Sequence, residues 1–349
     1  MNRNRLEYCY LLPEIIDLLS TDDIYSPDPF AKVKKQATRF AYSEAVIELA
    51  GRNPNVVVLD ADVSKSIGTD KFAAMFPERS FNFGIAEQNM MAAAAGMATT
   101  GLIPFVSTYA VFASLRALDQ VRNSIHYPRL NVKIAASHSG ITPGPDGVTH
   151  QGQEDISLLR SIANSTVIAT ADSPTTKLAV WAAAEYDGPV YLSFTRDPVP
   201  FLFDMDFPFQ IGRIETIHTG NDATIIAMRD LLPQALVAAA VLAREGIQAR
   251  VLYCHTIKPL DEQAVLQAAA ETGAVVTAEN NVIFGGLGSA VAEILVENHP
   301  IPMQRVGVRD VFTESGPYLE LIRKYGLTSE YIIDAVKNVL ARKVKQYNL

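Results

Sequence analysis

The sequence predicts an α/β fold with two successive domains, each built on a parallel or mostly parallel sheet. Short apolar runs rich in β-branched residues, such as 56–59 and 223–228, alternate with longer segments that have apolar residues at helical spacing. Such alternation is typical of parallel strands covered by helices on both faces. A stretch rich in proline and phenylalanine, 197–222, divides the chain into two such series.

The first series starts near residue 39, and its central feature is a helix expected to begin at Glu87. Asn82 and Gly84 before it are turn formers, and a carboxylate suits the positive end of a helix. After Glu87 the next ionisable residue is Arg116. The other predicted elements are helix 41–49, strand 56–59, strand 103–107, helix 109–124, strand 132–136, helix 156–163, strand 166–170, helix 175–185 and strand 190–194.

The second series contains a glycine-rich run, Gly285-Gly286-Leu287-Gly288, between a predicted strand and a predicted helix. Its spacing is not G-x-G-x-x-G, so a close turn is favoured over a dinucleotide loop. The elements are strand 223–228, helix 231–245, strand 249–253, helix 261–271, strand 274–278, helix 288–297, strand 303–308 and a helix from 328. We therefore predict an N-terminal extension (1–35), a first domain (36–200), a linker (201–222) and a second domain (223–349).

Composition excludes several classes of protein. The length of 349 residues suits two domains, and the net charge of −8 argues against nucleic acid or an anionic membrane as the main partner. The two cysteines, Cys9 and Cys254, are far apart in sequence, which disfavours a disulfide scaffold and fits a cytoplasmic location.

Neither a signal peptide nor a membrane span is expected. The basic start is not followed by an uninterrupted apolar core. The uncharged run 88–115 is long enough to cross a bilayer, but Thr99-Thr100-Gly101 and Pro104 divide it into helix, turn and strand.

Polar residues follow several predicted strands of the first series. They are Asp60 and Asp62, Ser107 and Thr108, the loop 137–153, and Arg196. Ligands of open parallel sheets sit at the carboxyl ends of the strands, so we expect these residues to converge on one edge.

The loop 137–153 is dense in glycine and proline and carries His138, Asp146 and His150. These three residues form a candidate metal triad, which is the less favoured interpretation. Hydrogen bonding and acid–base work on a polyhydroxylated substrate is the favoured interpretation, and no metal ligand is predicted in this chain.

Four motifs in chain order resemble the C-terminal half of transketolases. They are the residues 84–89 (Gly-Ile-Ala-Glu-Gln-Asn), 107–112 (Ser-Thr-Tyr-Ala-Val-Phe), 146–151 (Asp-Gly-Val-Thr-His-Gln), and 256–261 with 279–281. The resemblance covers roughly residues 36–340 and implies a pyrimidine-binding domain followed by a transketolase C-terminal domain. The implied activity is transfer of a two-carbon ketol unit between sugar phosphates.

One part of the family pattern is missing. Transketolases hold the diphosphate and metal of thiamine diphosphate with an N-terminal domain that carries a Gly-Asp-Gly motif, which this sequence lacks. The resemblance therefore implies a separate subunit of a split transketolase. A partner subunit would hold the diphosphate and the Mg²⁺ or Ca²⁺ ion, in an expected α2β2 assembly.

The resemblance assigns four residues to binding of the coenzyme, mainly of its pyrimidine ring. Glu87 matches the glutamate that hydrogen-bonds a ring nitrogen, which requires a carboxyl group in a low-dielectric cleft. Phe112 matches the aromatic residue stacked on the ring, with Tyr109 beside it, and Asp62 matches an aspartate near the cofactor. A further family aromatic falls at Leu115. Without the resemblance, Glu87 would be only a helix-entry residue and both aromatics would be core residues.

The resemblance also assigns the residues that bind the substrate. His150 matches a histidine that faces the reacting carbons, and Asp146 matches a residue that contacts a substrate hydroxyl. Binding of the terminal phosphate falls to Arg39, Ser66, His138 and Arg196, since guanidinium groups pair bidentately with oxyanions. The alternative for Arg39 and Arg196 is a surface ion pair, for example Arg196 with Asp197.

Other functions share part of this pattern. The beta chain of a 2-oxo-acid dehydrogenase would need no phosphate-binding set, so Arg39, His138 and Arg196 argue mildly against it. A deoxyxylulose-phosphate synthase-like enzyme is a second alternative. A non-catalytic regulatory partner is a third, which the presence of both Glu87 and His150 disfavours.

Overall fold

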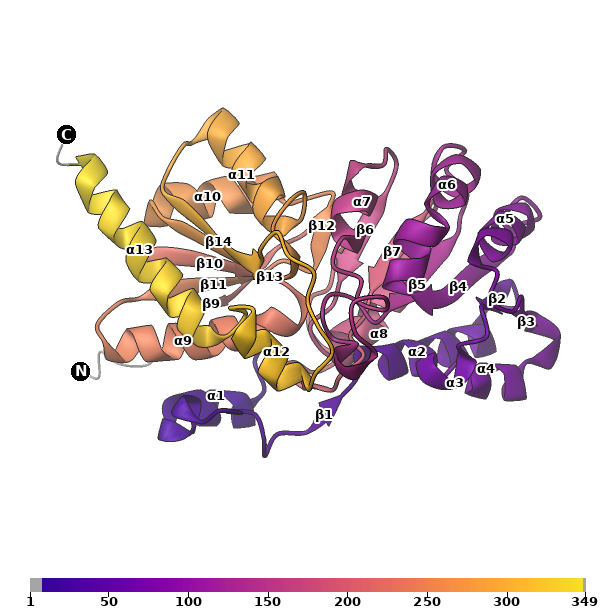
Figure 1. Ribbon diagram of the computed structural model, residues 1–349, viewed down its shortest axis with the longest axis horizontal. Helices are drawn as coiled ribbons and strands as arrows, with labels where there is room; N and C mark the ends of the chain where they lie inside the picture. The colour runs from indigo at the N-terminus through magenta and orange to yellow at the C-terminus, as the bar shows by residue number, and fades with distance from the viewer. Residues whose placement is uncertain (1–7, 348–349) are drawn as a thin grey trace.

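Two sheets, each covered by helices, lie side by side in the structure, a computed structural model that describes residues 8–347 (Figure 1). Residues 1–7 of the predicted N-terminal extension lie outside the described residues. Within the described part of the chain, no helix is both long enough and apolar enough to cross a membrane.

The first sheet has seven strands, all parallel except β12, which pairs antiparallel with β6. Alternate residues of β2 enter different cores: Val56 and Val58 pack under α2 and α8, whereas Val57 and Leu59 pack under α5. This is the period of two expected for a strand buried on both faces. The spatial order is β12 (Thr256–Lys258), β6 (Thr166–Ala169), β7 (Val190–Ser193), β5 (Lys133–Ser137), β4 (Ile103–Tyr109), β2 (Val56–Asp60) and β3 (Ser80–Asn82).

Helices cover both faces of this sheet, as the alternating sequence predicts. On one face α2 (Thr38–Arg52) packs against α8 (Ser173–Glu185), and on the other α5 (Glu87–Ala98) packs on β4. Short helices α3 (Ser64–Ile67), α4 (Asp70–Met75), α6 (Leu118–Gln120) and α7 (Asp155–Ser161) complete the unit. Strand β3 and helices α3 and α4 were not predicted, because these segments are too short to show a periodic pattern.

The predicted helix 109–124 differs from the structure in its type. Strand β4 continues to Tyr109, and the segments 112–116 and 121–126 are π-helical, for example with Ala117 N donating to the Phe112 carbonyl at 3.1 Å. Apolar spacing cannot distinguish these wider turns from α-helix. Such π-helical turns are frequent at functional sites.

The second sheet has five strands, of which only the edge strand β9 is antiparallel. Its core is closed on one face by α9 and α13 and on the other by α10 and α11. The strands in spatial order are β14 (Met303–Val308), β13 (Val275–Val282), β10 (Ala223–Ala227), β11 (Ala249–Tyr253) and β9 (Glu215–His218). The helices are α9 (Leu232–Arg244), α10 (Glu262–Thr272), α11 (Leu287–Asn298), α12 (Tyr318–Lys324) and α13 (Ser329–Tyr347).

The described part of the chain before α2 contacts both sheet units. The described part of the extension forms α1 (Pro13–Ser20), which packs on α9, and Arg244 pairs with Asp22 at 2.7 Å. Strand β1 (Lys35–Gln36) pairs with β8 (Val199–Pro200). The extension thus lies mainly against the second sheet unit, although it precedes the first in sequence (Figure 1).

The glycine-rich run 285–288 forms a close turn into α11, as predicted. The buried carboxylate of Glu279 accepts hydrogen bonds from the backbone N–H groups of Leu287 and Gly288, both at 2.8 Å. A Cβ at Gly286 would overlap this carboxylate. The anion site of this helix N-terminus is therefore filled by a side chain of the protein itself.

Candidate functional site

The residues expected to bind a terminal anion are brought together at the carboxyl edge of the first sheet. Arg39 in α2 lies 3.1 Å from the hydroxyl of Ser66 and 3.5 Å from Nε2 of His138. The hydroxyl of Tyr109 donates to Ser66 Oγ at 2.9 Å, and its ring stacks on His138 with centroids 3.7 Å apart. Four residues from four different elements therefore form one cluster.

Electrostatics keep this cluster receptive to an anion. Burial, together with the nearby charges of Arg39 and Arg196, lowers the pKa of His138 to about 2, so its ring is neutral. Burial also lowers the pKa of Arg39, with a further contribution from Arg196. Two guanidinium groups in one partly buried place favour a bound oxyanion, and the Nε of Arg39 has no hydrogen-bond partner among residues 8–347.

Arg196 lies beside two carboxylates. Its Nε is 3.5 Å from Asp146, and its Nη1 is 3.3 Å from Asp197. The alternative ion pair with Asp197 is thus present, in addition to the contact with the predicted substrate residue Asp146. Because Arg196 is partly exposed, these ion pairs are weak, and an incoming oxyanion can compete for the guanidinium.

Glu87 is the first residue of α5, and its side chain is only 1% exposed. The turn before it is set by Asn82, whose side chain accepts from the Gly84 N–H at 2.8 Å, and Gly84 has a positive φ. Burial of this carboxylate agrees with the sequence analysis. Its pairing with the guanidinium of Arg116, at 2.9 and 3.0 Å, was not predicted.

Aromatic rings connect Glu87 to the anion cluster. The ring of Phe112 lies under the Arg116 guanidinium, 4.2 Å from its carbon, and is nearly parallel to the ring of Tyr109 at 5.6 Å. His150 packs edge-on against Phe112 at 5.5 Å. The predicted ring-binding, reacting-centre and anion-binding residues therefore form a continuous path.

Two predicted positions line the margin of this path less closely. Asp62 follows β2 with a positive φ and accepts from the Asn82 side chain at 3.2 Å, which links it to the turn before Glu87. Leu115, where the family has an aromatic residue, is 48% exposed.

The second sheet unit packs against the loop 137–153 and the start of α7. The side-chain oxygen of Asn280 accepts from Ile141 N at 3.1 Å, and the Asn281 amide donates to Asp155 at 2.6 Å. Fully buried Arg229 donates to Asn281 at 2.7 Å and to Ser193 at 2.6 Å. The sequence analysis did not find Arg229, because nothing in its local pattern indicates burial between two sheets.

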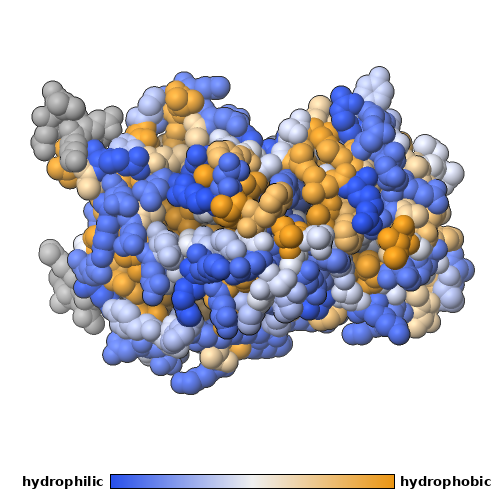
Figure 2. Space-filling view, in the orientation of Figure 1, coloured by the Kyte–Doolittle hydropathy of each residue, from blue (hydrophilic) through white to orange (hydrophobic). Residues whose placement is uncertain are grey.

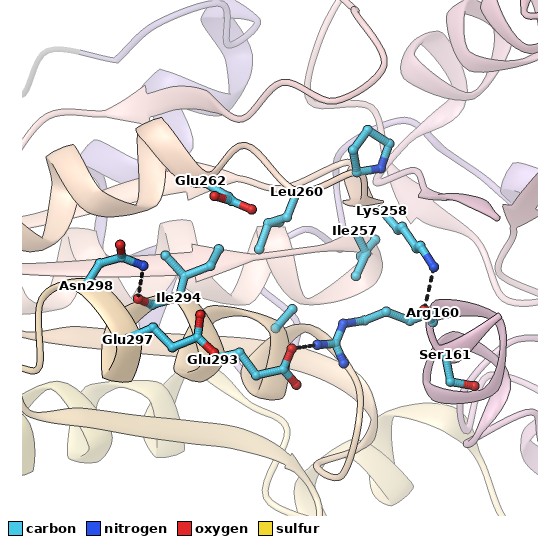
Figure 3. Close-up of a pocket in the computed structure, with 12 residues that line it drawn as sticks. Arg160, Ser161, Ile257, Lys258, Leu260, Glu262, Glu293, Ile294, Glu297 and Asn298 are labelled. Carbon is cyan, nitrogen blue, oxygen red and sulfur yellow. Dashed lines mark hydrogen bonds and ion pairs between the residues drawn. The ribbon is translucent and has the colours of Figure 1, made fainter. Parts of the chain in front are cut away.

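A separate surface pocket of about 750 Å³ lies between α7, the segment after β12, and α11 (Figure 3). In Figure 2, the surface at the top of the molecule is hollowed between the two sheet units. The cations of this pocket are already engaged: Arg160 pairs with Glu293, and Lys258 donates to the carbonyls of Arg160 and Ile162. None of the predicted site residues lines it.

Among the described residues, no group of three or more His, Cys, Asp and Glu side chains is arranged to hold a metal ion. The residues present fit one part of thiamine diphosphate. A buried carboxylate beside aromatic rings suits an aminopyrimidine, but the sequence offers no Gly-Asp-Gly motif for the diphosphate and its metal.

Two domain families match the chain. Residues 34–200 match "Transketolase, pyrimidine binding domain", and residues 212–332 match "Transketolase, C-terminal domain". The chain belongs to the transketolase family. It corresponds to the pyrimidine-binding and C-terminal domains of that family, made as a separate subunit.

Relatives of the same extent support this assignment. The chain is 42% identical over 316 residues to a 6-deoxy-6-sulfo-D-fructose transketolase subunit of Clostridium sp. (strain MSTE9), covering 90% of this chain and 98% of the relative. It is 44% identical to a putative transketolase C-terminal section of Methanocaldococcus jannaschii, covering 87% and 96%. A solved structure described as "Split gene transketolase, inactive beta4 tetramer" is 48% identical, with a TM-score of 0.82, and covers 89% and 100%.

The transketolase resemblance assigned roles to the predicted site residues, but it did not identify Arg116. One signal was available: Arg116 is the first ionisable residue after Glu87. A buried carboxylate in a charge-free region needs a partner, and the next charge along the chain is the natural candidate.

Proposed function

We propose that this chain is the C-terminal subunit of a thiamine-diphosphate-dependent transketolase that moves a two-carbon ketol unit between sugars with a terminal oxyanion. The observation that carries the proposal is the buried Glu87 carboxylate, joined through Phe112 and His150 to the cluster of Arg39, Ser66 and His138. In this proposal, residues 36–200 and 223–349 act as the two family domains, with 1–35 as an extension and 201–222 as a linker.

Each side chain has a defined task in the reaction. Glu87 holds a proton at the pyrimidine nitrogen, and Phe112 with Tyr109 orients the ring by stacking. Bound thiamine diphosphate supplies the carbon nucleophile that attacks the ketose carbonyl. His150 moves a proton at the reacting carbons, and Asp146 and Asp62 orient a sugar hydroxyl and the coenzyme.

The far end of the sugar is held by charge. Arg39 and Arg196 pair with the terminal oxyanion, and Ser66 and His138 complete the set. A 2-oxo-acid dehydrogenase would leave these two arginines without a ligand, so that alternative is not favoured. Phosphate and sulfonate both present the oxygens that such a site binds.

A partner subunit is part of this proposal. It would carry the diphosphate-binding domain and the Mg²⁺ or Ca²⁺ ion, in a cytoplasmic α2β2 enzyme. The exposed small residues Ala92 and Gly96 on α5 allow a close approach of that partner. A relative described as an inactive beta4 tetramer agrees with a chain that needs another subunit for activity.

The test is to co-express the chain with a subunit that carries a Gly-Asp-Gly motif and to assay the pair against sugar phosphates and sulfonated sugars. We expect ketol transfer by the pair and none by this chain alone. Glu87→Gln should lower kcat by about a hundredfold or more, because the ring nitrogen loses its acid–base partner. Full activity of that variant, or coenzyme turnover by the isolated chain, would contradict the proposal.

A further inference from the structure

The side chain of Arg116 touches both residues proposed to hold the pyrimidine ring. Its Nη1 lies 3.0 and 2.9 Å from the two carboxylate oxygens of Glu87. Its guanidinium carbon lies 4.2 Å from the centroid of the Phe112 ring. One planar, hydrogen-bond-donating cation therefore satisfies the carboxylate and covers the aromatic ring at the same time.

A pyrimidine ring in this site has to meet the same two conditions. It must place a ring nitrogen within hydrogen-bond distance of Glu87, and it must stack within van der Waals distance of Phe112. The guanidinium already occupies the volume in which both conditions hold. A ring and the guanidinium cannot fill that volume together.

We propose that Arg116 is a further residue of the coenzyme-ring site. Its guanidinium occupies the ring's place in the free chain and moves out of that place when the ring binds. This inference rests on the proposed function, because it takes the pyrimidine of thiamine diphosphate as the ligand. In the free chain, the ion pair stabilises a carboxylate that would otherwise be buried alone.

For such an exchange, the Arg116 side chain has to be more exposed to solvent than the Glu87 side chain, and it is. The Glu87 side chain is 1% exposed, whereas the Arg116 side chain is 44% exposed. The guanidinium can move into solvent without opening the core, while the carboxylate stays in place. Glu87 has no other ion-pair partner within the part of the chain that the structure describes.

Because the ion pair between Glu87 and Arg116 has to break before the ring binds, a variant without this ion pair should bind the coenzyme more tightly. In Arg116→Gln the competing ion pair is lost, so the pair formed with the partner subunit should bind thiamine diphosphate and Mg²⁺ about three- to tenfold more tightly by calorimetry. Arg116→Lys keeps the charge but not the planar stacking, and an intermediate Kd is expected. Arg122→Gln, at an exposed arginine of the same helical stretch, should leave Kd unchanged.

Three outcomes separate the possibilities. Tighter binding by Arg116→Gln with no change in Arg122→Gln supports the exchange. Unchanged or weaker binding by Arg116→Gln overturns this inference alone, since Arg116 would then assist the ring or be irrelevant to it. A wild-type pair that binds no thiamine diphosphate overturns both the proposed function and this inference.

A second measurement guards against a folding defect. Thermal unfolding of the isolated chain, its single variants Glu87→Gln and Arg116→Gln, and the double variant measures the coupling between the two side chains. We expect the double variant to unfold at a higher temperature than Arg116→Gln, because it no longer buries an unpaired carboxylate. Additive effects of the two substitutions would overturn the inference, since no ion pair would then exist to be exchanged.

Discussion

Glu279 and Glu87 are both buried carboxylates that stand near helix N-termini, and their partners differ. Glu279 is satisfied by two backbone N–H groups of α11, whereas Glu87 is satisfied by the partly exposed side chain of Arg116. Backbone donors are fixed by the helix and cannot be withdrawn. A guanidinium on a flexible stem can be replaced by a ligand, so only the second carboxylate suits a binding site.

Glu279 gives the folded protein a predictable dependence on pH. Burial raises the pKa of Glu279 from its ordinary 4.5 to about 7, against the opposing effect of its two N–H partners. The folded state therefore binds one more proton than the unfolded state between about pH 4.5 and 7, so this group's contribution to stability falls by a few kcal/mol as pH rises through that window.

Urea unfolding of wild type and Glu279→Gln from pH 4.5 to 8 measures this effect. The variant should lose this part of the pH dependence, because glutamine does not titrate. Glu297→Gln, at an exposed position of α11, is the control and should keep the wild-type slope. Identical slopes for wild type and Glu279→Gln would contradict the prediction.

At the scale of elements, the loop 137–153 is held by backbone contacts as well as by side chains. Gly140 has a φ of +60°, and a Cβ there would overlap the backbone carbonyl oxygen of Asn280 in β13. Gly147 and Gly152 are similarly close to Ser315 and Ala110. These three glycines of the loop therefore mark close packing between elements.

Gly140→Ala tests this packing. The substitution adds a steric overlap to an unfavourable φ, so we expect it to destabilise the protein by about 3 kcal/mol or more. Gly101→Ala has a similarly positive φ but no atom within 4 Å of the added Cβ, and it should cost only about 1 kcal/mol. Equal urea midpoints for the two variants would show that the contact with Asn280 is not limiting.

At the scale of the whole molecule, Arg229 joins the two sheet units. It donates to Ser193 at the end of β7 and to Asn281 in β13, and Asn281 in turn donates to Asp155 at the start of α7. The apolar core is also continuous, since one cluster contains Val106 of the first sheet and Ile226 of the second. The second unit thus fixes the position of the loop that carries His150.

Arg229→Met should uncouple the two units. Removing a fully buried cation leaves several acceptors without a donor, at a cost of about 3–5 kcal/mol. We expect scanning calorimetry to show a lower Tm and a transition that separates into two. Arg213→Met, at an arginine that is 55% exposed, should change stability by less than about 0.5 kcal/mol. A wild-type Tm for Arg229→Met would contradict a coupling role.

The sequence by itself determined the two α/β units, the start of α5 at Glu87 and the nature of the glycine-rich turn, because each depends on local periodicity or turn chemistry. The family resemblance, and not the local pattern, assigned Arg39, Ser66 and His138 to one anion site and His150 to the reacting carbons. Only the tertiary structure decided that Arg116 pairs with Glu87 and that Arg229 lies between the sheets. Both contacts join residues far apart in sequence, and only the folded chain brings those residues together.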